Sequence, residues 1–170
     1  EEVEALATVD VLRRADLKVK IVGVGSDVIT GAHGISTVCD AVDSDLTPGY
    51  DIEAVILPGG MPGTLNLERS DKVNGFVDYA YENKKLVCAI CAAPSILGHK
   101  GMLKGKKAVC FPGFENELEG AELSDSFVVT DGNIITAKGM GSAVKFGIAI
   151  GAAFVGEAKM KKIEESLQCS

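Results

Sequence analysis

The stretch "KLVCAICAAPSILG", from Lys85 to Gly98, changes character at Cys91. Before Cys91 it is a nearly continuous apolar run, typical of a strand buried on both faces of a parallel sheet. After Cys91 come small residues, a proline and an apolar helical pattern, so a helix is expected to begin within 92–99. Proline is tolerated there because the first turn of a helix needs no N–H from it. The stretch predicts a strand, a sharp turn at Cys91 and a helix.

Strands and helices alternate on both sides of this stretch. Helices are expected at 1–15, at 70–83 with Ser70 as N-cap, and at 141–168, where an apolar helix precedes a charged one. Strands are expected at 18–25, 28–30, 35–42, 53–60 and 105–110, and 126–139 reads as a hairpin turning at Asp131-Gly132. This alternation predicts an α/β sandwich with a mostly parallel sheet, helices on both faces and the hairpin as an antiparallel appendage.

Length and composition favour one domain. The chain has 170 residues, of which 46% are hydrophobic, enough for a single core spanning 1–170. No apolar run reaches the roughly 18 residues that a bilayer crossing needs. The net charge of −7 repels nucleic acids and anionic membranes at long range. A small molecule or another protein is therefore the expected partner.

The cysteines indicate a reducing, cytoplasmic setting. There are five, an odd number, and the sequence shows no signal peptide: Cys39, Cys88, Cys91, Cys110 and Cys169. Cys88 and Cys91 have the CxxC spacing of zinc ligands or of a redox pair. A second pair of cysteines or histidines at zinc spacing is missing from the sequence, so no metal is expected.

The position of Cys91 favours a reactive thiol. Ligands of open α/β sheets bind beyond the carboxyl ends of the strands, where Cys91 is expected to lie. Free N–H groups at the start of a helix stabilise an anion, so the pKa of this thiol is expected to be depressed. Cysteine is also a common core residue, and Cys88 is interpreted as one. The local pattern alone leaves both interpretations open for Cys91.

A second turn could complete the site. "LPGG", from Leu57 to Gly60, also ends a strand, and glycines let a backbone N–H approach a bound oxygen. If the two strands are neighbours, the N–H groups of Gly60 and Ala92 could form an oxyanion site beside the thiol, with Gly59 next to it. Alternatively, Gly59 and Gly60 only make the turn.

These motifs together carry a resemblance to a known family. "AICAAP" (89–94), preceded by "AVILPGG" (54–60) and followed by "GMGSAVKFGIAI" (139–150), resembles the ThiJ/PfpI superfamily, in particular its bacterial-type ThiJ-like branch. This superfamily includes the Parkinson-associated deglycase family often called DJ-one. The resemblance implies a flavodoxin-like fold, a single class I glutamine amidotransferase-like domain over 1–170, and a homodimer. Because family members usually begin with a strand, it also implies that a leading strand is missing here.

The resemblance assigns roles to particular residues. It implies a nucleophile at Cys91, an acid from the first helix at Glu4, and an approaching glycine at Gly60. Burial and like charge favour the protonated form of such an acid, which can then donate a hydrogen bond to sulfur. Without the resemblance, Glu4 would simply complement the helix dipole.

Two departures from the family disfavour a cysteine-histidine protease. Ala92 stands where protease-like members carry histidine, and Phe111 stands where some deglycase-branch members carry another. His99 is interpreted as structural, and His33, like Phe111, is a candidate for the pocket rim. The resemblance implies cofactor-free hydrolysis of α-oxoaldehydes, such as methylglyoxal and glyoxal, or of their adducts on proteins. Alternatives are a redox-responsive chaperone or sensor acting through Cys91, and a ThiJ-like protein of thiazole monophosphate biosynthesis.

Overall fold

The computed structural model describes residues 1–168, so Cys169 lies outside the described residues. The helices are α1 (Glu2–Arg14), α2 (Gly63–Arg69), α3 (Asp71–Glu82), α4 (Pro94–His99), α5 (Ala143–Val155) and α6 (Glu157–Ser166), with short 3₁₀ helices η1 (Asp43–Asp45), η2 (Glu115–Glu117) and η3 (Met140–Ser142). The strands are β1 (Val22–Gly23), β2 (Val28–Thr30), β3 (Ser36–Val38), β4 (Ala41–Val42), β5 (Ala54–Leu57), β6 (Leu86–Ile90), β7 (Lys107–Ala108), β8 (Glu122–Leu123), β9 (Val128–Asp131) and β10 (Ile134–Ala137).

A four-stranded sheet forms the centre, in the order β5-β6-β10-β9. β6 pairs in parallel with both β5 and β10, while β9 is antiparallel at the edge. The shorter strands pair as β1 with β4, β2 with β3, and β7 with β8. The carboxyl ends of β5 and β6 are therefore neighbours, as the proposed oxyanion site requires.

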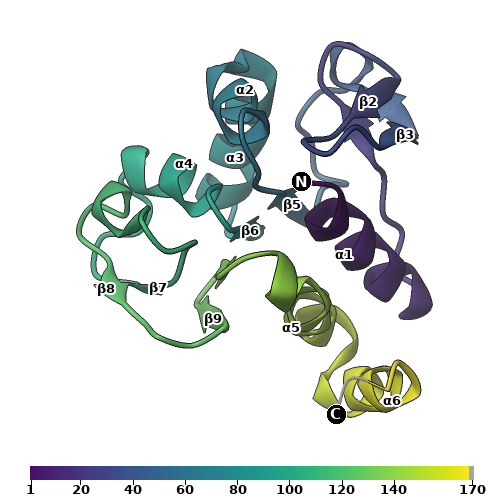
Figure 1. The fold of residues 1–170 in the computed structure, drawn as a ribbon, viewed down its shortest axis with the longest axis vertical. Coiled ribbons are helices and arrows are strands. Elements are labelled where there is room, and N and C mark those ends of the chain that lie inside the picture. Colours follow the sequence, from purple (N-terminus) through teal and green to yellow (C-terminus); the bar gives the residue numbers. More distant parts are fainter. Residues whose placement is uncertain (169–170) are drawn as a thin grey trace.

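Helices cover both faces of this sheet, as Figure 1 shows. Successive side chains of β6 point to opposite faces. Val87 and Ala89 pack into a core cluster with residues of α3 and α4. Cys88 and Ile90 pack into a second cluster with Leu12 of α1 and with residues of α5. The expected three-layer α/β architecture with a mostly parallel sheet is confirmed.

The two helices flanking the functional strands carry the expected end signals. α1 has Glu2 and Glu4 in its first turn and two arginines in its last turn, which complements the helix dipole. The Ser70 hydroxyl accepts a hydrogen bond from the N–H of Val73 (3.3 Å) and caps α3. Both helices begin within one residue of their predicted start.

Several elements differ from the sequence prediction. β1 and β7 are only two residues long. The N–H groups of Ile21, just before β1, and of Lys107, the first residue of β7, donate to the carboxylates of Asp40 and Asp131 (2.8 and 2.9 Å). Since Asp131 pairs with Ile134 in the hairpin, the turn residues are 132–133, one position later than predicted. The hairpin also contributes more than an antiparallel edge, because β10 joins the central sheet. The sequence analysis did not anticipate α2.

Among the described residues, none of the helices has the length and apolar character needed to span a bilayer.

Candidate active site

Cys91 occupies a sharp turn between β6 and α4. Its φ is +65°, a left-handed conformation that non-glycine residues rarely adopt and that is frequent at functional sites. The turn is held because the Cys91 N–H donates to the Ala137 carbonyl (2.9 Å) and the Cys91 carbonyl accepts from the Phe111 N–H (2.8 Å). The side chain is half-buried. The backbone thus presents this thiol at the carboxyl end of the sheet.

Glu4 of α1 reaches the same place. Its side chain is 1% exposed, and one carboxyl oxygen accepts a hydrogen bond from the Gly59 N–H (2.8 Å). The carboxyl group is also hydrogen-bonded to the Cys91 side chain. Burial raises the pKa of the Glu4 carboxyl, against the opposing effects of the bonds to Cys91 and Gly59. The structure therefore brings together the two residues that the resemblance paired.

The turn after β5 lies against both groups. A Cβ on Gly59 would meet the Cys91 Cβ at 2.6 Å and the nearest Glu4 oxygen at 2.9 Å, so glycine is needed there. The Gly59 N–H, expected near an oxyanion, is instead used to hold Glu4. The N–H groups of Gly60 and Ala92 are hydrogen-bonded to the Cys91 sulfur. These two groups are positioned to stabilise negative charge at the site.

The environment of Cys91 does not favour the expected low pKa of the thiol. Burial first, and then the charge and hydrogen bonding of the Glu4 carboxylate, raise the pKa of Cys91 to about 11. The N–H groups of Gly60 and Ala92 act in the opposite direction but are outweighed. The start of α4 alone would lower the pKa of the Cys91 thiol. Partial burial of the sulfur and the neighbouring Glu4 carboxylate raise this pKa by more. Both pKa shifts favour keeping a proton between Glu4 and Cys91.

The other predicted residues lie around this centre. The Phe111 N–H is hydrogen-bonded to the Cys91 carbonyl, and the Phe111 ring is half exposed. The ring packs against Gly139, where a Cβ added to that glycine would lie 3.1 Å from it. His33 lies in the turn between β2 and β3, with Glu1 between it and the 59–60 turn. His99 is the last residue of α4 and binds two glutamates, a network that the sequence pattern did not signal.

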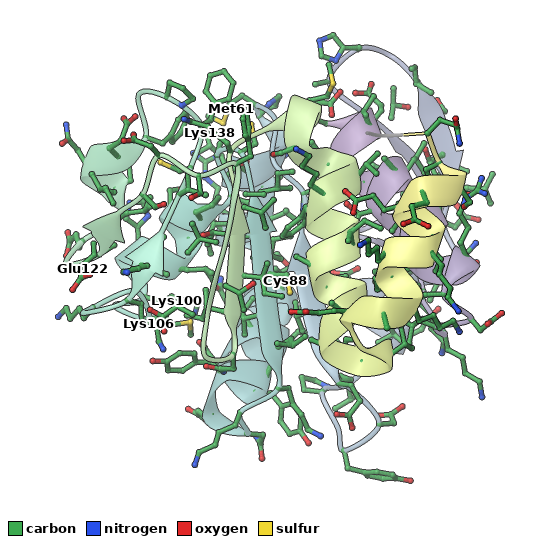
Figure 2. All side chains as sticks on the ribbon, turned by 90° about the horizontal axis from the view of Figure 1, so that it is seen from below. Met61, Cys88, Lys100, Lys106, Glu122 and Lys138 are labelled. Atoms are coloured by element: carbon green, nitrogen blue, oxygen red, sulfur yellow. The ribbon has the colours of Figure 1, made fainter. Side chains whose placement is uncertain are left out.

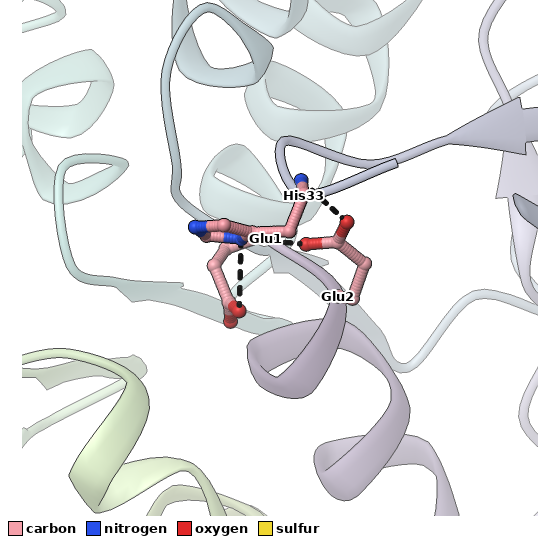
Figure 3. Close-up of side chains that lie close together, drawn as sticks. All are labelled: Glu1, Glu2 and His33. Atoms are coloured by element: carbon pink, nitrogen blue, oxygen red, sulfur yellow. Dashed lines mark hydrogen bonds and ion pairs between the residues drawn. The ribbon is translucent and has the colours of Figure 1, made fainter. Parts of the chain in front are cut away.

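Glu1, Glu2 and His33 are the residues best placed to hold a metal ion. One ligand atom from each lies within 4.8 Å of the others. Figure 3 shows the three side chains close together. However, one Glu2 oxygen accepts from the N–H groups of His33 and Ile35 (2.7 and 3.3 Å), and the other lies 3.3 Å from the His33 ring. These contacts explain why the three side chains lie together: Glu2 attaches the β2–β3 turn to α1. We call this set of contacts the Glu2 clasp.

The remaining described cysteines differ from Cys91. The side chain of Cys88 is fully buried in the sheet layer, and burial raises the pKa of its thiol. Figure 2 shows Cys88 in the interior, whereas Met61 and Lys138, which follow β5 and β10, lie together at one end of the molecule. Cys39, Cys88, Cys91 and Cys110 are all free thiols.

Comparison with solved structures gives close matches over nearly the whole chain. A DJ-1 superfamily protein from Salmonella typhimurium matches with a TM-score of 0.92 and 33% identity, covering 99% of this chain and 92% of the other. Drosophila melanogaster DJ-1beta matches with a TM-score of 0.92 and 29% identity, covering 99% of this chain and 91% of the other. These neighbours support the flavodoxin-like fold.

Curated relatives agree. Protein DJ-1 homolog B of Arabidopsis thaliana is 34% identical over 98% of this chain, but the chain spans only 39% of that protein's length. Protein dj-1beta of Drosophila melanogaster is 30% identical over 98% of this chain and 90% of its own. The model of the DJ-1/PfpI family matches residues 1–153. The chain therefore belongs to the DJ-1/PfpI family.

Proposed function

We propose that this protein is a cysteine-dependent, cofactor-independent hydrolase acting on α-oxoaldehydes such as methylglyoxal and glyoxal, either free or as adducts on proteins. This activity is that of a glyoxalase or protein deglycase. The hydrogen bond between Glu4 and Cys91 carries the proposal, because it puts a nucleophile and a proton carrier in contact. Membership of the DJ-1/PfpI family supports it.

Each group has a role in the proposed reaction. The Cys91 sulfur attacks the aldehyde carbon, and the carbonyl oxygen takes the proton held between Cys91 and Glu4, which gives a thiohemiacetal. The N–H groups of Gly60 and Ala92 stabilise the oxyanion as it forms. Glu4 then moves a proton from the former aldehyde carbon to the neighbouring carbon through an enediol, and the hydroxyl proton on the first oxygen passes to the second oxygen. The first carbon is thereby oxidised to a thioester and the second reduced to an alcohol.

Water completes the reaction by hydrolysing the thioester. It adds to the thioester, the carbon–sulfur bond breaks, and the thiol recovers its proton. Methylglyoxal and one water thus give one lactic acid, with no external oxidant or reductant. Compartments that keep thiols reduced, such as the cytoplasm, suit this nucleophile.

A protease is a weaker interpretation of the same site. A cysteine protease needs a base beside its nucleophile to transfer a proton to the leaving amine. The hydrogen-bond partners of the Cys91 side chain among the described residues are Glu4, Gly60 and Ala92. Phe111 occupies the position where the resemblance would put a histidine, and its ring cannot transfer a proton.

A second candidate function is sensing of oxidants through Cys91, with or without a chaperone role. Peroxide would convert the thiol through sulfenate to sulfinate, supplying both oxygens and leaving as water. The N–H groups that face the sulfur, together with Glu4, could hold the product's oxygens. One solved neighbour, 27% identical with a TM-score of 0.92, is Toxoplasma gondii DJ-1 in an oxidized form.

The exposed apolar residues suit a homodimer. Val3 on α1 and Val28, Ile35 and Val38 around the β2–β3 hairpin are all more than two-fifths exposed, and Val38 is 74% exposed. The Glu2 clasp joins these two elements, so their exposed apolar residues belong to connected parts of the surface. Covering such a surface with a second copy removes apolar area from water.

Lactate production from methylglyoxal tests the main proposal. The wild type should produce lactate, Cys91→Ser should not, and Cys39→Ser should match the wild type because Cys39 lies between β3 and β4, outside the segments that form the site. If the wild type makes no lactate while peroxide converts Cys91 to sulfinate, the sensor function is favoured. Equal lactate from Cys91→Ser and the wild type would eliminate the proposed nucleophile.

A further inference from the structure

The imidazole of His99 contacts two carboxylates at once. Nδ1 lies 2.5 Å from Oε1 of Glu68, and Nε2 lies 2.7 Å from Oε2 of Glu117. Ionised carboxylates only accept hydrogen bonds, and a neutral imidazole has one donor and one acceptor nitrogen. Both contacts are therefore hydrogen bonds only when the ring is protonated. Consistently, the hydrogen bonds to Glu68 and Glu117 raise the pKa of His99.

These three side chains come from segments that begin next to the candidate active site. Glu68 is on α2, which starts beside the 59–60 turn and is tied to it, because the N–H and hydroxyl of Thr64 donate to the Gly60 carbonyl (2.9 and 3.0 Å). His99 ends α4, the helix that follows Cys91. Glu117 ends η2, which follows Phe111. The His99 contacts thus join the far ends of the three segments.

The segment 111–117 is held by hydrogen bonds at its two ends and, between them, by Phe114, which packs against the first core cluster. At one end the Phe111 N–H binds the Cys91 carbonyl, and hydrogen bonds from Phe114 to Phe111 and from Glu117 to Phe114 continue along the segment. A cavity of about 190 Å³ lies against it, lined in part by Pro112 and Glu115, so packing there is incomplete. The other end is held at Glu117 by His99.

The backbone shows how closely this second end approaches α4. A Cβ on Gly98 would lie 2.0 Å from the Glu117 carbonyl oxygen, so only glycine permits the contact. The approach brings the Glu117 side chain within reach of the His99 ring. Two charged residues near His99 have other partners. Lys100 forms an ion pair with Asp78 of α3 (2.7 Å), and the Glu115 carboxylate accepts a hydrogen bond from the Gly113 N–H (2.7 Å). Arg69 is the residue after Glu68 on α2.

We infer that protonated His99 is a positioning residue, which clamps the segment 111–117 and α2 to α4 and so fixes the entrance to the Cys91 site. When the His99 ring loses its proton, one of its two nitrogens has no hydrogen to donate to the carboxylate that it faces. One of the two contacts then opens, and the segment 111–117 loses its second anchor. The consequence for turnover rests on the proposed function, whereas the clamp itself does not.

The direction of the pH dependence follows from the raised pKa of His99. The folded protein holds this proton more tightly than an unfolded chain, whose histidines titrate at about 6.5. The clamp is therefore complete below about pH 6.5 and is lost as the pH rises through the folded pKa. A neutral partner in place of one glutamate removes this dependence, because an amide can donate to a neutral imidazole.

Amide hydrogen exchange over 111–118 in the full chain tests the clamp. Protection factors, corrected for the intrinsic effect of pH, are compared at about pH 5.5 and about pH 8.5, on either side of the histidine range. In the wild type, protection should fall about fivefold at the higher pH, the size expected of a partly exposed charged pair. His99→Ala should give the low value at both pH values. His33→Ala, which changes the chain's other histidine, should retain the wild-type behaviour.

Glu117→Gln is the decisive variant. Its amide N–H can donate to Nε2 while Nδ1–H donates to Glu68, so protection should stay high at both pH values. Alkylation of Cys91 and lactate production, measured alongside, show whether the entrance also changes. Equal protection in wild type and His99→Ala at the lower pH, or the same fall in Glu117→Gln as in wild type, would overturn the inference. Because exchange needs no substrate, an absence of lactate would count against the proposed function alone.

Discussion

The carboxyl group of Glu4, in the first turn of α1, is hydrogen-bonded to the thiol of Cys91 at the end of β6, and Gly59 lies between the two residues with no space for a side chain. The pKa of each group is raised. Like charges in contact cannot both be ionised cheaply, so the pair retains a proton that either group can release.

Glu4→Gln should separate thiol reactivity from turnover. The Glu4 carboxylate is, after burial, the main cause of the high pKa of Cys91, so its removal should lower that pKa and speed alkylation at neutral pH. Lactate production should fall by about 10²-fold or more, because the amide cannot transfer a proton. Iodoacetamide labelling and the lactate assay, at matched thermal stability, measure the two effects. If neither rate changes, Glu4 has no part in the chemistry.

Cys91 should be alkylated far faster than Cys88 in the native protein. Cys91 is half-buried, whereas Cys88 is fully enclosed in the sheet and its pKa is higher still. The labelling of Cys91 should accelerate as the pH rises toward about 11, because the thiolate is the reactive form. Mass spectrometry of the labelled peptides measures both sites. Equal labelling would contradict the greater accessibility of Cys91, which is half-buried in the turn.

Gly59→Ala should disrupt the site. The new methyl group would overlap the Cys91 Cβ and the Ile90 carbonyl oxygen (2.6 and 2.7 Å), at a cost of about 1–3 kcal/mol in the free energy of unfolding. Activity should fall further than stability, because Glu4 and Cys91 would be pushed apart. Gly63→Ala, in the first turn of α2 with open space around it, is the matched control and should be neutral or slightly stabilising. Thermal unfolding and lactate assays compare them, and equal effects in both variants would refute the close approach.

Val38→Lys should weaken the proposed homodimer without affecting the fold of the single chain. Val38 is 74% exposed on β3, so the charge costs nothing in a monomer, but it would be desolvated between two copies. Light scattering should show a dimer for the wild type and a lower mass for the variant at the same concentration. Val22→Lys is the control, since Val22 is 40% exposed on β1, outside the proposed surface. A wild-type monomer across micromolar concentrations would contradict the dimer.

Local sequence signals were sufficient to predict the α/β architecture and the turn at Cys91. Hydrophobic periodicity and helix-end residues are local signals, so they revealed α1, α3, β6 and the turn at Cys91. The family motifs then pointed to Glu4 and Gly60. The lengths of β1 and β7 were overestimated, and at the start of each strand an aspartate side chain from elsewhere in the chain accepts from a backbone N–H.

The hydrogen bonds and the pKa values of the site could be found only from the tertiary structure. The N–H of Gly59 binds Glu4, the pKa of Cys91 is raised, and His99 joins Glu68 to Glu117. None of these features follows from a local pattern, because each depends on burial and on charges brought together from distant parts of the chain. Sequence periodicity reports which face of an element is buried, whereas a pKa or a hydrogen bond depends on which atoms lie within a few ångströms once the elements have packed.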